Sequence, residues 1–423
     1  MREQEIRTSH AGRPWSNWFW PQRGGSVVAE LEPAALLPDV NARTFNVHLF
    51  IGARPNIPKA ATVQRAFRLH PLASHARLTT VHTGQHSSKA MASALIRELG
   101  VDVDHYLRSR TAQTDPGHLA QLVRALDQHM KHHAGRIDSS IVVGDVNSTV
   151  AASIVSARYG IPVVHVEAGL RSHFQEPEEL NRKLITAASS FHLPASATDA
   201  RNLIAESVDA SDIFLVGNAH TETLLTARSR SARKGIVARL KLTDKPYTIL
   251  YVHKPATIRN GDWVSALFAK VQQLSGDLVI ALHPGAKRRL LKLAPEVLSL
   301  EGAIYVPSLS HGEFSALMRH SACVVTDSAG LQEESTVLGT SCITVGAPTA
   351  RPVTCTTGSA TFVGFDLEQC SHALIKVREP RQLNYPIPPL WDTEVSQRIS
   401  NAISEILRRT ADNQQGRAVL RVV

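Results

Sequence analysis

From Phe45 onward, hydrophobic and polar positions alternate between two patterns. Short β-branched and apolar runs, typical of strands buried on both faces, are separated by longer stretches with helical periodicity. We predict strands at Phe45–Ile51, Leu78–Thr83, Ser140–Val143, Pro162–Val166, Phe191–Pro194, Ile213–Val216, Thr248–Val252, Asp277–Leu282, Ala303–Pro307, Ala322–Thr326 and Ser341–Val345. Between and after them we predict helices near Ile57–Leu69, Lys89–Leu99, Gly117–His133, Ser148–Tyr159, Glu179–Ser189 and Glu394–Arg408.

This alternation predicts an α/β fold made of two Rossmann-like, doubly wound domains with parallel sheets. We expect the two domains to face each other across a cleft. With a seam near Gly217, the predicted parts are an N-terminal domain of 45–216 plus 395–412, a C-terminal domain of 217–394, and a tail of 413–423.

Residues 1–44 are predicted to be an N-terminal extension, partly disordered or docked, because Trp15, Trp18 and Trp20 cluster there among Arg and Pro residues. The extension has no apolar segment behind a basic start, so it does not resemble a secretory signal. Hydrophobic residues make up 43% of the 423 and charged residues 20%, values typical of a soluble globular protein. No run approaches the roughly 18 apolar residues of a membrane span, which argues against a membrane partner.

Charge and cysteine content narrow the function classes further. The net charge of +9 is spread without a long Lys/Arg run, which fits a small anionic ligand or a solvated surface and argues against nucleic acid. The four cysteines form no C-x-x-C pair, so we expect reduced thiols in a cytoplasmic protein. His129, His132 and His133 follow a helical pattern, and we expect no metal there or elsewhere.

Unusual polar residues follow the predicted strands, where doubly wound folds bind their ligands. Arg54 and Lys59 follow the first strand, beside a glycine turn that leads into a helix, as in anion sites. No G-x-G-x-x-G follows any predicted strand, so no nicotinamide cofactor is expected. Asp145 and Glu167 follow later strands, and Glu178 lies at the start of the next helix. Asp145 or Glu178 alone could simply cap a helix, but three converging acids suit proton transfer.

The second half of the chain repeats this arrangement. His253 and His283 follow its first two strands. A lone histidine after a strand is more often structural than catalytic, but one that faces three acids across a cleft is more often catalytic. Asp327-Ser328-Ala329-Gly330 opens a helix whose backbone N–H groups could bind a diphosphate, and Glu334 lies one turn further on, within reach of ribose hydroxyls. Arg351 follows the last predicted strand as a second possible phosphate contact.

These residues resemble the UDP-N-acetylglucosamine 2-epimerase family from about Phe45 to Gly364. The motifs occur in the family's order: GARPN, VHTGQH, GDVNST, HVEAGLRS, PEELNR, DSAGLQEES and TARP. HVEAGLR followed by DSAGLQEE carries most of the specificity. The resemblance implies a GT-B-like pair of Rossmann-type domains, a UDP-sugar substrate, no cofactor and a homodimer.

The resemblance also implies a reaction and a set of roles. The family eliminates UDP across C1–C2 of the sugar to give 2-acetamidoglucal and re-adds it after protonating the other face of C2, which requires a base and an acid on opposite faces. By motif, the acid–base carboxylates are Asp145, Glu167 and Glu178, and His253 accompanies the leaving diphosphate. The UDP-sugar contacts are Arg54, Lys59, Arg182, His283, Phe314, Ser328, Ala329, Gly330, Glu334 and Arg351.

Ala168 to Arg171, in HVEAGLR, resemble the non-hydrolysing branch, which returns UDP-N-acetylmannosamine. The sequence departs from the family at His253–Thr257, where H-R-R-E-N is HKPAT, and at Ala350 and Val353, where two acids are lost. These departures leave room for a specialised pathway, such as an antibiotic or other secondary-metabolite sugar. Two alternatives stay open: a hydrolysing epimerase or GT-B glycosyltransferase on the same scaffold, and an inactive UDP-sugar binder.

Overall fold

The computed structural model describes residues 44–85, 89–107, 115–172, 176–226, 232–243, 245–307, 309–377 and 385–420. The predicted N-terminal extension, 1–44, lies outside them except for its last residue. The strands are β1 Phe45–Ile51, β2 Ala76–His82, β3 His105–Tyr106, β4 Ser139–Val143, β5 Val163–Ala168, β6 Phe191–Pro194, β7 Tyr247–Tyr251, β8 Asp277–Ala281, β9 Ile304–Val306, β10 Cys323–Thr326, β11 Ser341–Val345 and β12 Ala360–Gly364.

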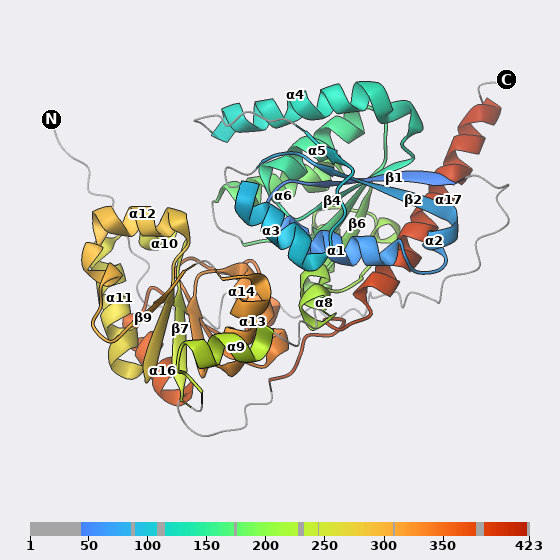
Figure 1. Cartoon of the computed structure of the whole chain (residues 1–423). Coiled ribbons are helices and arrows are strands. Elements are labelled where there is room, and N and C mark those ends of the chain that lie inside the picture. Colours follow the sequence, from blue (N-terminus) through green and yellow to red (C-terminus); the bar gives the residue numbers. More distant parts are fainter. Residues whose placement is uncertain are drawn as a thin grey trace. The chain divides into compact units, whose positions relative to one another are not determined.

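Helices connect these strands (Figure 1). They are α1 Asn56–Ala66, α2 Leu72–His75, α3 Lys89–Leu99, α4 Asp115–His133, α5 Asn147–Arg158, α6 Pro177–Ala188, α7 Ala197–Ala205, α8 Ala219–Thr226, α9 Ala232–Arg239, α10 Pro255–Ile258, α11 Gly261–Leu274, α12 Pro284–Leu293, α13 His311–His320, α14 Ala329–Leu338, α15 Pro352–Thr356, α16 Leu367–Val377 and α17 Val395–Leu420. Short 3₁₀ turns occur at Ala134–Arg136, Ala210–Asp212 and Pro295–Leu298.

The strands form two six-stranded sheets, in the orders β3-β2-β1-β4-β5-β6 and β12-β11-β10-β7-β8-β9. Every pairing within them is parallel. Read from opposite edges, the two strand orders are the same doubly wound topology. In each sheet, later strands are added on the other side of the first strand, which makes that position the switch point. The predicted α/β class with two Rossmann-like sheets is therefore confirmed. The loops after β1, β4, β7 and β10 lie at the two switch points, where such folds bind ligands.

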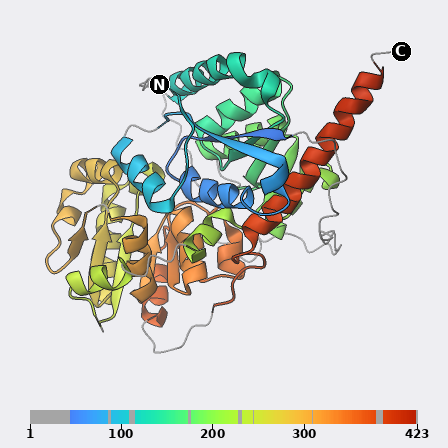
Figure 2. The same cartoon turned by 45° about the vertical axis from the view of Figure 1, so that its right-hand side comes forward.

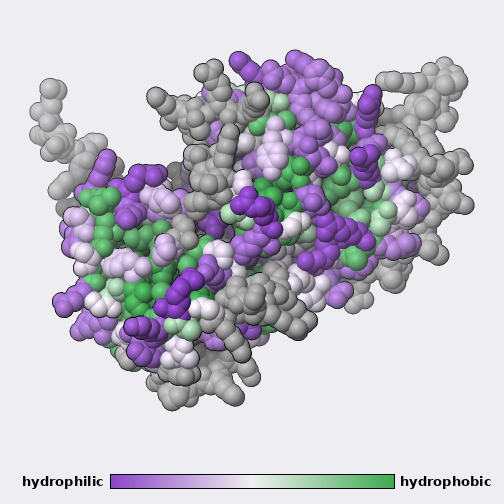
Figure 3. Space-filling model, in the orientation of Figure 1, coloured by the Kyte–Doolittle hydropathy of each residue, from purple (hydrophilic) through white to green (hydrophobic). Residues whose placement is uncertain are grey.

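Helices cover both faces of the first sheet, and the alternation of side chains along β1 shows why. Val47, Leu49 and Ile51 are buried in one core with residues of α1, α3 and α17. Phe50 points to the opposite face and packs with residues of α4 and α5. Because successive strand residues face opposite sides, a strand covered on both faces must be apolar nearly throughout, as β1 is. Hydrophilic residues gather over the outward side of α4 (Figure 3).

The last helix, α17, packs against α1, α2 and α8 (Figure 2). Its Ile399, Ile403 and Ile406, one or two turns apart, are buried in the same core as β1. The helix continues to Leu420, into the segment predicted as a tail. The predicted domain boundaries stay a proposal.

The strand prediction fails at three places. Ile213–Val216 is not a strand, because only Ile213 forms an isolated bridge, with His192. The segment donates single backbone hydrogen bonds to the edge of β6 and then turns away at Gly217, where φ is +93°. The sequence analysis also missed β3 and β12, which are edge strands of the two sheets. β3 has only two residues, neither of them buried, and two of the five residues of β12 are exposed or half-buried. Both therefore lack the continuous apolar run by which buried strands are recognised.

Candidate functional site

The turn after β1 is built by Asn56, the first residue of α1. Its side-chain oxygen accepts hydrogen bonds from the backbone N–H of Gly52 at 3.2 Å and of Ala53 at 2.9 Å, and its amide donates to the carbonyl of Val143 at 2.8 Å. A Cβ at Gly52 would lie 2.3 Å from the hydroxyl of Ser148, so the turn admits no side chain there. Asn56 thus joins the ends of β1 and β4, a role the sequence analysis missed.

Glu167 occupies an unusual backbone position near the end of β5. Its φ is +67°, and the pairing of β5 with β6 shifts register between Val166 and Ala168. A non-glycine residue in this region costs about 1–3 kcal/mol and persists only where the surroundings enforce it. Such bulges re-aim a side chain at the end of a strand. The strain is a local reason to regard Glu167 as functional.

Two cations hold the buried carboxylate of Glu167. Lys59, from α1, forms an ion pair with Glu167 Oε2, and Arg351 donates to Oε1 at 2.9 Å. Gly144 leaves the space these groups need: its φ is +70°, and a Cβ there would lie 3.2 Å from Lys59 Nζ. Three residues that the sequence predicted separately therefore meet: Lys59, Glu167 and Arg351.

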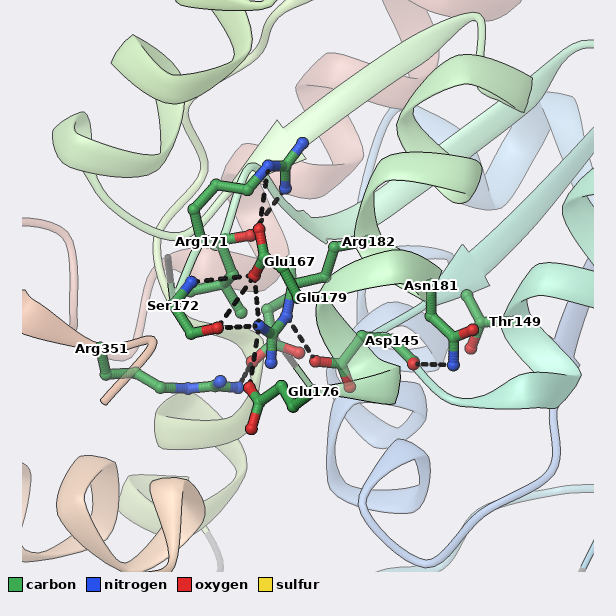
Figure 4. Close-up of polar contacts among 12 residues, drawn as sticks. Asp145, Thr149, Glu167, Arg171, Ser172, Glu176, Glu179, Asn181, Arg182 and Arg351 are labelled. Carbon is green, nitrogen blue, oxygen red and sulfur yellow. Dashed lines mark hydrogen bonds and ion pairs between the residues drawn. The ribbon is translucent and has the colours of Figure 1, made fainter. Parts of the chain in front are cut away.

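Asp145, which follows β4, is paired with Arg182 of α6. The Arg182 Nε donates to Asp145 Oδ2 at 2.8 Å (Figure 4). Burial by itself opposes ionisation of Asp145, but the charges of Arg182, Arg351 and Lys59 outweigh it and lower the pKa. Asp145 is therefore held as a carboxylate at neutral pH.

Glu178 has the opposite proton affinity. It lies in the first turn of α6, just after Pro177, and keeps a solvent-exposed surface. Partial burial of its carboxyl raises the pKa, and the negative charges of Asp145 and Glu176 add to the effect. Its neighbour Glu179 is the buried acid of this turn.

Two arginines anchor that first turn of α6. Glu179 accepts from Arg182 at 2.8 Å and from the backbone N–H of Ser172 at 2.9 Å. Arg171 forms an ion pair with Glu206 through its Nε at 2.7 Å and lies 3.9 Å from Glu179. Both guanidinium groups are buried, so they fix the turn that carries Glu178.

In the second sheet, His253 follows β7 and Asp327 follows the neighbouring strand β10. The Asp327 carboxylate is 3.0 Å from His253 Nδ1 and accepts from the backbone N–H of His253 and of Lys254, the latter at 2.8 Å. Burial opposes the ionisation of Asp327, yet the hydrogen bond from His253 and its other donors lower the pKa. The carboxylate therefore favours the tautomer with hydrogen on Nδ1 and leaves Nε2 to act elsewhere.

The remaining predicted residues of the second sheet lie around this pair. His283 accepts from the N–H of Gly285 at 3.1 Å and so caps α12, and its ring centroid is 6.4 Å from that of His253. Phe314 packs edge-on against Tyr251, with centroids 6.0 Å apart.

Ser328 is the N-cap of α14, whose first two residues are Ala329 and Gly330. Arg54 is close enough for its charge to contribute to the lowered pKa of His283, a shift caused mainly by burial.

A cluster of buried charges includes residues that the sequence analysis did not select. Arg351 donates to Glu333 at 2.7 Å as well as to Glu167. His220, at the start of α8, lies 3.1 Å from Glu333 and 3.0 Å from Glu334. Burial alone would lower the pKa of His220, but hydrogen bonds to the two carboxylates raise it to about 9. The adjacent glutamates in the QEE motif, Glu333 and Glu334, indicated that a cationic residue would pair with them. No motif near position 220 identified His220 as that residue.

Two general features of the described residues concern metals and membranes. In that part of the chain, no group of three or more His, Cys, Asp or Glu is arranged to hold a metal ion. None of the helices described combines the length and the apolar character that crossing a bilayer requires. The VHTGQH motif ends at His86, which lies outside the described residues.

Comparison with known proteins identifies relatives along most of the chain. A family model described as UDP-N-acetylglucosamine 2-epimerase matches residues 71–404. The UDP-N-acetylglucosamine 2-epimerase of Methanocaldococcus jannaschii is 27% identical over 336 residues, 77% of this chain and 90% of the relative. A Pseudomonas aeruginosa UDP-2,3-diacetamido-2,3-dideoxy-D-glucuronate 2-epimerase is 28% identical over 322 residues, 74% of this chain and 87% of the relative.

Solved structures agree with these sequence matches. The M. jannaschii UDP-GlcNAc 2-epimerase, solved in complex with UDP-GlcNAc and UDP, superposes with a TM-score of 0.77 at 25% identity. The match covers 85% of this chain and 100% of that one. The two doubly wound sheets are thus of the GT-B-like kind that the family resemblance implied.

Proposed function

Because the chain belongs to the UDP-N-acetylglucosamine 2-epimerase family, we propose that it is a non-hydrolysing enzyme that interconverts UDP-N-acetylglucosamine and UDP-N-acetylmannosamine. The observation that carries the proposal is the carboxylate of Glu167, strained at the end of β5 and held between Lys59 and Arg351. It lies near the carboxyl end of β5, beside the switch point of the first sheet, with Asp145 after β4 and Glu178 in the first turn of α6. A protein that only bound UDP would not need these three carboxylates.

The proposed chemistry is elimination followed by re-addition. The C2–H bond is not acidified by a neighbouring carbonyl, so its proton leaves as the C1–O bond to the diphosphate breaks, which gives 2-acetamidoglucal and UDP. Protonation of the opposite face of C2 and return of UDP to C1 complete the inversion. The protein must supply a base, an acid on the other face, and positive charge for the departing diphosphate.

The proton affinities of the carboxyl groups support this division of labour. The pKa of Asp145 is lowered, whereas that of Glu178 is raised. Neighbouring carboxyls with opposed pKa shifts suit an ionised group and a proton-carrying group. We assign Asp145 to the ionised role and Glu178 to the proton-carrying role, with Glu167 as the carboxylate between the two cations.

Cations and a histidine are proposed to serve the diphosphate. Arg54, Lys59 and Arg351 supply positive charge at the ends of both sheets. Asp327 orients His253 through Nδ1 and leaves its Nε2 available. We propose that Nε2, when it carries hydrogen, donates a hydrogen bond to the leaving oxygen. We further propose that the backbone at the start of α14 and the side chain of Glu334 contact the nucleotide.

Proton and phosphorus NMR of the purified protein with UDP-N-acetylglucosamine in D₂O tests the proposal. We expect UDP-N-acetylmannosamine with deuterium at C2 and little free UDP. Stoichiometric UDP with free N-acetylmannosamine would instead assign the hydrolysing reaction. An unchanged, undeuterated substrate would contradict epimerisation of this sugar.

Glu178→Gln supplies an internal check on the roles. Glutamine keeps the shape of the side chain but cannot carry the proton, so we expect epimerisation to fall about 10²-fold or more. The variant should retain UDP affinity, because Glu178 is not among the proposed nucleotide contacts. Full activity in Glu178→Gln would overturn its role while leaving the reaction itself intact.

The sugar itself is a second question. The P. aeruginosa relative acts, by its name, on a diacetamido glucuronate, and this chain lacks acids of the family pattern at Ala350 and Val353. We therefore include that modified UDP-sugar in the assay, and preference for it would favour a specialised pathway.

The resemblance also supports a homodimer, and the four cysteines without disulfides support a cytoplasmic location. Light scattering and cell fractionation test these two proposals.

A further inference from the structure

His220 lies at the start of a helix that is fixed firmly to its neighbour. Thr62 of α1 donates to the carbonyl of Ala219 at 2.7 Å, and Thr223 of α8 donates to the carbonyl of Pro58 at 2.7 Å. The two threonine hydroxyls also lie 2.9 Å apart. Because these bonds tie α8 to α1, the backbone of His220 has little freedom, and its ring is presented to α14 in a defined position.

The imidazole is placed to bond two carboxylates at once. Nδ1 lies 3.1 Å from Glu333 and Nε2 lies 3.0 Å from Glu334. Ionised carboxylates accept hydrogen bonds but do not donate them, so both contacts are satisfied only when both ring nitrogens carry hydrogen. The geometry therefore favours the imidazolium form. Without that charge, two adjacent buried carboxylates would repel each other.

His220 closes a chain of alternating charges. The order of contacts is Lys59, Glu167, Arg351, Glu333, His220 and Glu334, cation and anion in turn. Three carboxylates are balanced by three cations only if His220 is charged. From α13, the ring of His311 also faces it, with centroids 6.4 Å apart. Removing one member of a buried chain leaves its neighbours with uncompensated charge.

We propose that His220 is a positioning residue of the nucleotide site, whose imidazolium holds Glu333 and Glu334 in place and offsets their negative charge where UDP binds. This inference rests on the proposed function, which places Glu334 beside the nucleotide. A carboxylate has two oxygens with about four lone-pair sites, so Glu334 can accept ribose hydroxyls on one oxygen while His220 holds the other.

Substituting His220 with a neutral residue should weaken nucleotide binding more than chemistry. The amide of His220→Gln can satisfy one carboxylate but leaves a net negative charge facing an anionic diphosphate. We expect the Kd for UDP and the KM for the UDP-sugar to rise about tenfold, with kcat reduced less than threefold. The reason for the split is that Asp145, Glu167 and Glu178 do not contact the imidazole.

His220→Lys and His192→Gln sharpen the test. Lysine restores the positive charge and should recover most of the lost UDP affinity. His192 is also buried but lies in the first sheet, on β6, away from α14. His192→Gln therefore controls for the loss of a buried imidazole and should leave UDP affinity unchanged.

Calorimetric titration with UDP at pH 7.5, long-range ¹H–¹⁵N NMR of the imidazoles and epimerase kinetics supply the measurements. Wild-type UDP affinity in His220→Gln, equal effects in the Gln and Lys variants, or a neutral His220 ring at pH 7.5 would each overturn the proposal. If wild-type protein binds UDP but exchanges no C2 proton, the epimerase function is refuted. The UDP affinities of wild-type protein and the His220 variants then still decide the role of His220. Wild-type protein that does not bind UDP would refute both.

Discussion

Mild acid should destabilise the folded chain through four buried histidines. Burial is the largest cause of the lowered pKa of each: to about 3 for His48 and His165, and to about 4 for His129 and His192. His165 donates through Nε2 to the carbonyl of Gly144 at 2.8 Å. The Nδ1 atoms of His165 and His192 are buried without a hydrogen-bond partner among the described residues. Protonating either of these two rings would therefore place a charge with an unpartnered donor in a buried site.

The sign and size of the effect follow from linkage. Because each folded pKa lies below the ordinary 6.5, the stabilisation is full above pH 6.5 and is lost as the pH falls from there toward the folded pKa. At pH 5 an unfolded histidine is about 97% protonated. Each of the four rings therefore lowers the free energy of unfolding by about 2 kcal/mol, or about 8 kcal/mol in total.

His220 works in the opposite direction. Its raised pKa of about 9 means that its contribution is full below pH 6.5 and is lost as the pH rises through 9. As the pH falls from 7.5 to 5, the contribution of His220 to the free energy of unfolding increases by about 1.4 kcal/mol. We therefore expect the free energy of unfolding to fall by about 7 kcal/mol in total. Typical domains are stable by about 5–15 kcal/mol, so a change of this size brings the chain close to unfolding.

Urea unfolding at several pH values between 7.5 and 5.0, followed by circular dichroism, measures the effect. His192→Leu should reduce the loss by about 2 kcal/mol, because one proton fewer is taken up on unfolding. His75 is exposed, and His75→Gln should reproduce the wild-type profile. Wild-type stability that changes by less than about 1 kcal/mol over this range would refute the reasoning.

Two further variants test the charged groups. In Glu167→Gln the charges of Lys59 and Arg351 lose their common partner, so the free energy of unfolding should fall by about 3–5 kcal/mol and epimerisation by about 10²-fold or more; unchanged urea midpoints and rates would contradict the role of the carboxylate. In Asp327→Asn, His253 loses the anion that fixes its tautomer, so kcat should fall about 10²-fold while circular dichroism stays native; a wild-type kcat would show that this pair does not act on the leaving group.

The sequence carried the local features of the fold. Continuous apolar runs marked the buried strands, because a parallel strand covered on both faces must be hydrophobic nearly throughout. Their carboxyl ends identified the segments that carry Lys59, Asp145, Glu167 and His253, since a doubly wound sheet brings ligands to those ends. The short edge strands β3 and β12 escaped prediction because partial exposure relaxes that pattern.

Tertiary structure alone decided which charges meet. Glu167 acquires its strained backbone from the register shift between β5 and β6, and its two cations come from positions 108 residues before and 184 residues after it. His220 meets Glu333 and Glu334 across more than 110 residues, through helix packing that no local pattern encodes. Sequence periodicity reports how each segment buries its own apolar face, whereas a buried ion pair depends on segments brought together by the whole fold.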